Sequence, residues 1–182
     1  MALPKLNESQ IEVLIHQVAE YIESQRHNYR GKATPLNTNQ KTVMAPFFPQ
    51  SVRDSTRVVG LAAERVSNPG FYSDLVAMGF EPGSLPDFAE MAAITFVDTV
   101  VFHEPIVNRL LFHELVHVVQ YTKLGLAEFA AKYVKGFLTG GSYEAIPLER
   151  NAYELDARFA KAPGDAFSVE DEVEEWIDFE LF

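Results

Sequence analysis

One stretch of this chain is apolar on almost every side when it is drawn as a helix. Residues 110–121 read Leu-Leu-Phe-His-Glu-Leu-Val-His-Val-Val-Gln-Tyr. At about 100° per residue, Glu114, His117 and Gln120 fall within about 100° of His113, and most other positions are aliphatic or aromatic. A surface helix carries charged residues over much of its circumference, whereas this stretch has Glu114 as its only Lys, Arg, Asp or Glu. The pattern therefore predicts a helix that the fold encloses on nearly all sides.

The polar face of this helix carries the spacing of a two-histidine metal site. His113 and His117 are four residues apart, so their imidazoles lie on one helical face with Glu114 beside them. Two such imidazoles can hold one Zn²⁺ at about 2.0–2.1 Å, and the adjacent glutamate can take a proton from the attacking water. The alternative is a core helix whose histidines bond to backbone carbonyls. Because unpaired buried His and Glu side chains are costly, the pattern favours zinc.

A catalytic zinc ion normally has three protein ligands, so the sequence must supply one more. The chain has 5 histidines and no cysteine, and none of the other histidines follows His117. A carboxylate is therefore expected. The best candidate is Glu149, in the first turn of a helix predicted to begin at Pro147. The alternatives are Glu144, Glu154, Asp156 and the acidic residues of the C-terminal tail.

The rest of the sequence predicts an α+β fold that is mostly helical, with a small sheet ahead of the metal helix. Helical spacing of apolar residues predicts helices over residues 8–29 and 126–138, a helix from Pro147 to Phe159, and a docked helix in the acidic tail. Strands are expected over residues 56–61 and in residues 93–102, the latter bent or divided near Asp98-Thr99. Residues 31–40 read as a polar connector, Gly125 as the end of the metal helix, and Asn7 with Gln10 as a capping box.

Length and charge narrow the class of protein. A chain of 182 residues without an internal repeat is expected to form one domain. Within it, residues 1–90 supply a helix and loops of unassigned role, residues 91–162 the core of the metal site, and residues 163–182 an acidic segment. A net charge of −11 disfavours nucleic acid and anionic membranes as partners. Because no signal peptide or 18-residue apolar run is present, a cytoplasmic location is expected; the oligomeric state is not indicated.

The motif and its surroundings resemble the gluzincin class of zinc metallopeptidases, which have His-Glu-x-x-His on one helix and a ligand Glu on a later one. The chain looks still more similar to a group of uncharacterised bacterial proteins of metallopeptidase type. This resemblance rests on Ile94-Thr95, on residues 111–121 and on residues 143–153, about a third of the chain. It implies a zincin-like fold in which His113, His117 and Glu149 bind the metal and Glu114 acts as the general base.

One position departs from the gluzincin pattern. The best-known gluzincins place an Asp four residues after the ligand Glu, where it orients a ligand histidine, and this chain has Tyr153 there. The phenol of Tyr153 is therefore expected to make the hydrogen bond to the histidine. A donor for the developing oxyanion is also needed. We expect Tyr143 in this role, with Tyr121, Tyr153 and His103 as alternatives.

These features predict a zinc-dependent hydrolase of peptide bonds, acting on a peptide or protein substrate. The sequence carries no signal for the specificity of cleavage. Two alternatives use the same ligands: a non-catalytic, zinc-stabilised domain that binds protein, and a latent peptidase whose cleft is filled by a terminal segment. Retention of Glu114 favours the enzyme, because a purely structural site has no use for a base between its ligands.

Overall fold

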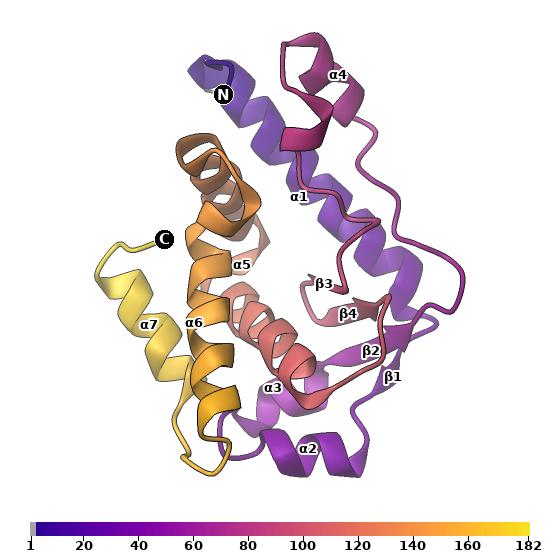
Figure 1. Ribbon diagram of the computed structural model, residues 1–182, viewed down its shortest axis with the longest axis vertical. Helices are drawn as coiled ribbons and strands as arrows, with labels where there is room; N and C mark the ends of the chain where they lie inside the picture. The colour runs from indigo at the N-terminus through magenta and orange to yellow at the C-terminus, as the bar shows by residue number, and fades with distance from the viewer. Residues whose placement is uncertain (1–2) are drawn as a thin grey trace.

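The computed structural model describes residues 3–182 and has an α+β fold, in which helices surround a small mixed sheet (Figure 1). The helices are α1 (Glu8–Arg30), α2 (Thr38–Met44), α3 (Gln50–Ser55), α4 (Tyr72–Ala77), α5 (Asn108–Gly140), α6 (Pro147–Lys161) and α7 (Val169–Asp178). The strands are β1 (Thr34–Pro35), β2 (Arg57–Gly60), β3 (Ala93–Phe96) and β4 (Thr99–Phe102), and short 3₁₀ turns lie at Pro82–Ser84 and Tyr143–Ala145. The fold class predicted from the sequence is confirmed. Among residues 3–182, no helix has the length and apolarity needed to cross a membrane.

The sheet has the order β1-β2-β4-β3, so β3 forms one edge. β3 also packs against α5, whose first half carries His113 and His117. β2 and β4 are parallel, while β3 and β4 form an antiparallel hairpin in which Phe96 pairs with Thr99. The expected division of residues 93–102 is thus confirmed, with the turn at Val97-Asp98, one residue earlier than predicted. Both hairpin strands are buried at every position because α5 and α1 pack against them.

Helix α5 runs through the middle of the molecule (Figure 1), and all residues from Leu111 to Tyr121 are buried. One apolar cluster packs around Leu111, Leu115 and Val118, together with α2, α3, α6 and α7. A second cluster, which includes Tyr121, joins the same helix to α1 and β3. The enclosure predicted from the apolar circumference is therefore confirmed, and the two clusters explain it because each covers a different side of the helix.

Two glycines shape the segment that follows the metal helix. Gly125 has φ 75° and ψ 164°, a backbone conformation that interrupts α5 and separates the metal helix from the second half of α5. Gly136 lies where α5 meets the start of α6, and a Cβ atom there would stand 2.6 Å from Cδ of Pro147. Because Gly136 has no side chain, the first turn of α6, which carries Glu149, can approach α5 closely.

The terminal elements agree with the sequence at most points. The capping box of Asn7 and Gln10 begins α1, and the C-terminal helix α7 buries Val169 and Val173 against the core. Lys123 of α5 forms ion pairs with Glu170 and Glu174 of α7. The prediction of a plain connector over residues 31–40 is wrong, because this segment adds β1 to the sheet and then begins α2.

Candidate metal centre

Three potential ligands of a metal ion converge between α5 and α6. Nε2 of His113 and Nε2 of His117 are 3.2 Å apart, as expected for imidazoles four residues apart on one helical face. Oε2 of Glu149 lies 3.5 Å from the first nitrogen and 3.4 Å from the second. All three residues are buried, and they form the one group of three or more His, Asp or Glu side chains with metal-ligand spacing in residues 3–182.

Hydrogen bonds on the far side of each imidazole determine which nitrogen faces the cluster. Nδ1 of His113 donates to Oδ2 of Asp156 over 2.9 Å, and Nδ1 of His117 donates to Oε1 of Gln120 over 2.8 Å. The Gln120 amide is oriented by its own NH₂ group, which donates to the Leu148 carbonyl and to Oδ1 of Asn151. With the protons on Nδ1, both Nε2 atoms direct lone pairs into the cluster.

The donor set fits a zinc ion. Oε2 of Glu149 is buried without a hydrogen-bond partner, so two lone pairs and a carboxylate oxygen face one another, and a cation between them would offset their repulsion. Ligands at about 2.0–2.1 Å around a tetrahedral centre lie about 3.3–3.4 Å from one another. The separations of 3.2, 3.5 and 3.4 Å in this cluster are close to that value. The two His and one Glu also match a known ligand set of catalytic zinc.

The local charges favour a positive charge at the imidazoles. Burial lowers the pKa of His113, but the hydrogen bond with Asp156 and the nearby carboxylates of Glu149 and Glu114 outweigh burial and raise this pKa to about 10. Burial raises the pKa of the Glu149 carboxyl, but the positive charges of His117 and His113 beside it hold this pKa far below its usual range. Glu149 is therefore ionised at neutral pH, and a metal ion would bind here in competition with protons.

Glu114 lies beside the ligands, and Thr95 holds its carboxylate. The hydroxyl of Thr95, on the edge strand β3, donates to Oε2 of Glu114 over 2.7 Å. Glu114 is only 4% exposed, and burial raises its pKa above the usual range of a glutamate. A carboxylate with a raised pKa is the better proton acceptor, which suits a general base.

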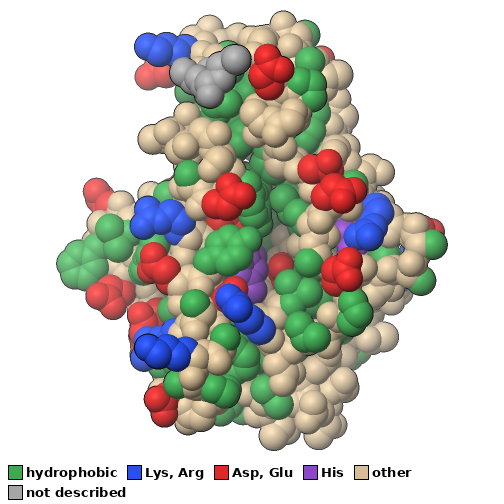
Figure 2. Space-filling view, in the orientation of Figure 1, with side chains coloured by type: hydrophobic (Ala, Val, Ile, Leu, Met, Phe, Trp, Pro, Cys, Tyr) green, Lys and Arg blue, Asp and Glu red, His purple; other side chains and the backbone are tan. Residues whose placement is uncertain are grey.

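Two hollows meet at this carboxylate. An open cleft of about 470 Å³ is lined by Arg109, His113, Glu114 and Tyr153, and Figure 2 shows the surface hollowed here, with histidine visible at its floor. A second, apolar pocket extends from Glu114 toward α1. Glu114 therefore borders both the open cleft and the apolar pocket.

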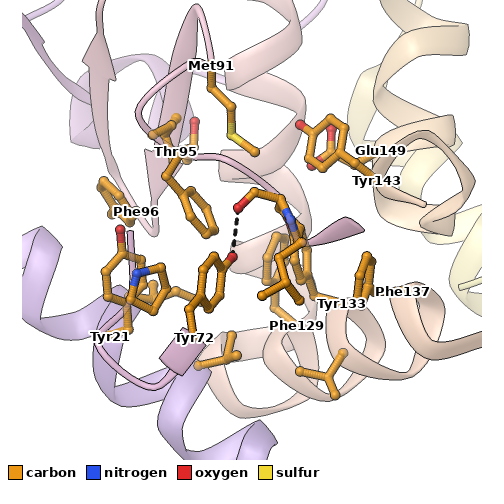
Figure 3. Close-up of a pocket in the computed structure, with 18 of the residues that line it drawn as sticks. Tyr21, Tyr72, Met91, Thr95, Phe96, Phe129, Tyr133, Phe137, Tyr143 and Glu149 are labelled. Carbon is orange, nitrogen blue, oxygen red and sulfur yellow. Dashed lines mark hydrogen bonds between the residues drawn. The ribbon is translucent and has the colours of Figure 1, made fainter. Parts of the chain in front are cut away.

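The two tyrosines singled out in the sequence have different surroundings. Tyr143 lines both hollows and lies beside Glu149 (Figure 3), so its hydroxyl group is within the site. The expectation that Tyr153 makes a hydrogen bond to a ligand histidine is wrong. Tyr153 is 44% exposed and packs its ring against that of His113, with the centroids 4.6 Å apart and the planes tilted by 54°. Asp156 makes the hydrogen bond instead.

Two of the alternative donors, Tyr121 and His103, do not line the open cleft. Tyr121 stacks on Phe129 and faces the apolar pocket rather than the open cleft. His103 is buried, and both of its ring nitrogens are engaged in hydrogen bonds. Its Nδ1 bonds to the carbonyl of Met91 over 2.7 Å and its Nε2 accepts from the backbone N–H of Val66 over 3.0 Å. His103 therefore links the segment that contains Met91 to the segment that contains Val66.

The other carboxylates once considered as ligands are not part of the ligand cluster. Glu144 and Glu154 are exposed, and Asp156 acts behind His113 instead. Sequence reasoning missed the orienting roles of Asp156 and Gln120. A signal for Asp156 was present: it lies seven residues after Glu149, two helical turns along the same face of α6.

Comparison with other proteins finds no relative whose site could be set beside this one. No known protein family, curated protein or solved structure matches the chain. The function of this site is therefore argued from its own residues: a buried His-His-Glu cluster, two side chains that orient its histidines, and a buried glutamate at the edge of an open cleft.

Proposed function

We propose that this protein is a zinc-dependent hydrolase of peptide bonds, with His113, His117 and Glu149 as metal ligands and Glu114 as general base. The observation that carries the proposal is the convergence of three electron-pair donors, two of which, the histidines, are oriented by hydrogen bonds on the far side of their rings. The proposal is further supported by the position of Glu114, which is held by Thr95 and borders the open cleft beside the ligands. A purely structural zinc site needs neither a general base beside the ligands nor an open cleft.

When bound, Zn²⁺ supplies Lewis acidity, which activates water and polarises a carbonyl oxygen. Glu114 accepts a proton from the attacking water, a task that its raised pKa favours. The same carboxylic acid then returns the proton to the leaving amine, so that water and one amide become a carboxylic acid and an amine. Tyr143, which lines both hollows, donates a hydrogen bond to the developing oxyanion.

The positions of the terminal segments do not support the alternative of a latent peptidase whose cleft is filled by one of them. The residues that line the open cleft lie between Met91 and Asp156, and none belongs to residues 3–31 or 163–182. Helix α7 packs against α5 and α6 (Figure 1). We therefore expect activity without removal of a terminal segment.

The decisive variant is Glu114→Gln, which preserves the shape of the side chain but removes the proton acceptor. We expect zinc content and melting temperature close to those of the wild type, with cleavage slowed by about 10²–10⁴-fold or more. The measurement is a mass-spectrometric screen of a diverse peptide library near pH 7 with zinc present. Products that appear with the wild type and not with the variant support the peptidase.

Two other results would argue against the proposal. Identical product sets from both proteins would assign the cleavage to a contaminant. The absence of products from both, with full zinc occupancy, would favour a zinc-stabilised binding domain. Glu154→Gln is a matched control, because it makes the same chemical change at an exposed position of α6 and should cleave like the wild type.

A further inference from the structure

The apolar pocket beside the metal centre is built largely from parts of the chain outside the metal motif. Helix α1 contributes Leu14, Val18 and Ile22, and the second half of α5 contributes residues between Phe129 and Leu138. The segment before β3 closes another side with Tyr72 and other aromatic or aliphatic residues. Figure 3 shows Glu149 and Tyr143 on one side of this pocket and Tyr21 and Phe96 across from them.

The pocket is polar at one end only. Its polar groups at the metal centre are those of Thr95, Glu114, His117, Tyr143 and Glu149. Farther away the lining is aliphatic and aromatic, and two of its tyrosines use their hydroxyl groups elsewhere. The hydroxyl of Tyr21 donates to the carbonyl of Ser67 over 2.7 Å, and that of Tyr72 donates to the carbonyl of Pro86 over 2.9 Å. An occupant with a polar head at the metal centre and an apolar tail matches this division.

The pocket is longer than one amino-acid side chain. The lining residues of α1 run from Leu14 to Ile22, and eight residues at 1.5 Å each span about 12 Å. The lining residues of α5 from Phe129 to Leu138 cover a similar length. A Leu or Phe side chain reaches only part of this distance from its Cα atom. An elongated group is therefore the better match.

The length of the pocket sets the size of that group. An extended chain advances about 1.1–1.2 Å for each bond. A straight hydrocarbon chain of about six to nine carbons is therefore about 6–10 Å long and fits within the span of about 12 Å along α1.

We propose that this pocket binds a straight hydrocarbon chain of about six to nine carbons, attached next to the amide bond that is hydrolysed. The substrates are then amides that carry a medium-length acyl or alkyl group, with the apolar chain between α1 and α5 and the amide at Glu114. The identity of the reacting bond rests on the proposed function, whereas binding of the chain rests on the pocket alone. The chain aligns the amide because its far end is held by the walls of the pocket.

The first test measures how binding depends on chain length. Zinc-loaded, full-length protein is titrated calorimetrically with acetohydroxamate and with its hexanoyl, octanoyl and dodecanoyl homologues. Each added methylene should tighten binding by about fourfold until the pocket is filled. We expect this gain to stop beyond octanoyl. Equal affinity for all homologues would overturn the proposal, as would a phenylalanine hydroxamate that binds as tightly as the best straight chain.

A variant that fills the pocket supplies the second test. Val18 lines the pocket and is half-buried, so Val18→Trp places a large ring in the path of the chain. This variant should bind acetohydroxamate like the wild type and lose most of the gain for octanohydroxamate. The matched control is Val13→Trp, one and a half turns earlier on α1, which is 55% exposed and does not line the pocket. An unchanged gain in Val18→Trp would overturn the proposal.

A third measurement, without metal, separates this inference from the proposed function. The fluorescent dye 1-anilinonaphthalene-8-sulfonate binds apolar pockets, and 1-octanol should displace it from wild-type protein more readily than from Val18→Trp. If hydroxamates fail to bind but octanol distinguishes the two proteins, the zinc hydrolase is wrong and the chain-binding pocket stands. If acetohydroxamate binds but neither longer homologues nor octanol show a preference, the pocket proposal is wrong and the zinc site stands.

Discussion

Oδ2 of Asp156 accepts a hydrogen bond from Nδ1 of His113 over 2.9 Å. Its other oxygen is held by the guanidinium group of Arg109, 2.7 Å away, so the carboxylate cannot rotate freely. Partners behind a metal-binding histidine fix the orientation of its ring and strengthen its lone pair. Asp156→Asn should therefore weaken zinc binding by about 10–100-fold while the ligands remain. Competition with a zinc-binding dye measures the change, and equal affinities would contradict this role.

Variants of two glutamates near the start of α6 test which residue is the third ligand. Glu149→Ala should lower zinc affinity by orders of magnitude, because it removes the anionic ligand from the cluster. Glu144→Ala, five residues earlier and exposed, should bind zinc like the wild type. Elemental analysis of purified protein should find close to one zinc per wild-type chain. If both variants keep the metal, the third ligand lies elsewhere.

Because α5 and α6 approach closely at Gly136, we expect one methyl group added there to lower the stability of the protein. In Gly136→Ala the new Cβ atom would lie 2.6 Å from Cδ of Pro147, so one helix must shift. Overpacking of this kind lowers the free energy of unfolding by about 1–3 kcal/mol. Since Pro147 is two residues from Glu149, zinc affinity should fall as well. Urea denaturation and metal titration measure the two effects.

A matched glycine serves as the control for this variant. Gly164 lies in the turn after α6, and a Cβ atom there would have no neighbour within 4 Å. Gly164→Ala should change the free energy of unfolding by less than about 0.5 kcal/mol. Similar losses in both variants would show that the effect at Gly136 comes from the backbone and not from contact with α6.

The β3–β4 turn is tied to α1 by charge. Asp98 pairs with Arg26 at 2.9 Å and with Arg30 at 2.6 Å. Burial raises the pKa of Asp98, but these guanidinium groups outweigh burial and lower the pKa overall. Because the folded protein holds this carboxyl ionised, its contribution to stability is fully present above the unfolded pKa of about 3.9. The contribution is lost as the pH falls through the lower pKa of the folded state.

Asp98→Asn tests this pH dependence. At pH 7 the variant should unfold with a free energy about 1–3 kcal/mol below that of the wild type, because hydrogen bonds to charged groups are lost. The difference should begin to shrink below about pH 4, where the unfolded chain takes up a proton at Asp98, and should vanish below the lower pKa of the folded state, where the wild-type carboxyl is protonated too. Urea denaturation at several pH values gives both curves. A difference that stays constant down to pH 3 would contradict the ionic explanation.

Local patterns in the sequence were enough to predict most elements of the fold. The apolar circumference of residues 110–121 required an enclosed helix, and the capping box of Asn7 and Gln10 marked the start of α1. These features depend on neighbours within a few residues, which is the range over which helical periodicity and capping act. The connector over residues 31–40 was misread because β1 exists only through its pairing with β2, a partner that local periodicity does not reveal.

The His113/Glu114/His117 spacing likewise followed from the helix alone, since residues four apart share a face. That Glu149 joins them, that Asp156 and not Tyr153 bonds to His113, and that Gln120 orients His117 depend on how α6 packs against α5. The apolar pocket depends on α1, whose lining residues lie more than ninety residues before Glu114 in the chain. The sequence by itself determined which side chains share a helical face, and only the tertiary structure decided which faces meet, because helix packing depends on contacts between residues distant in the chain.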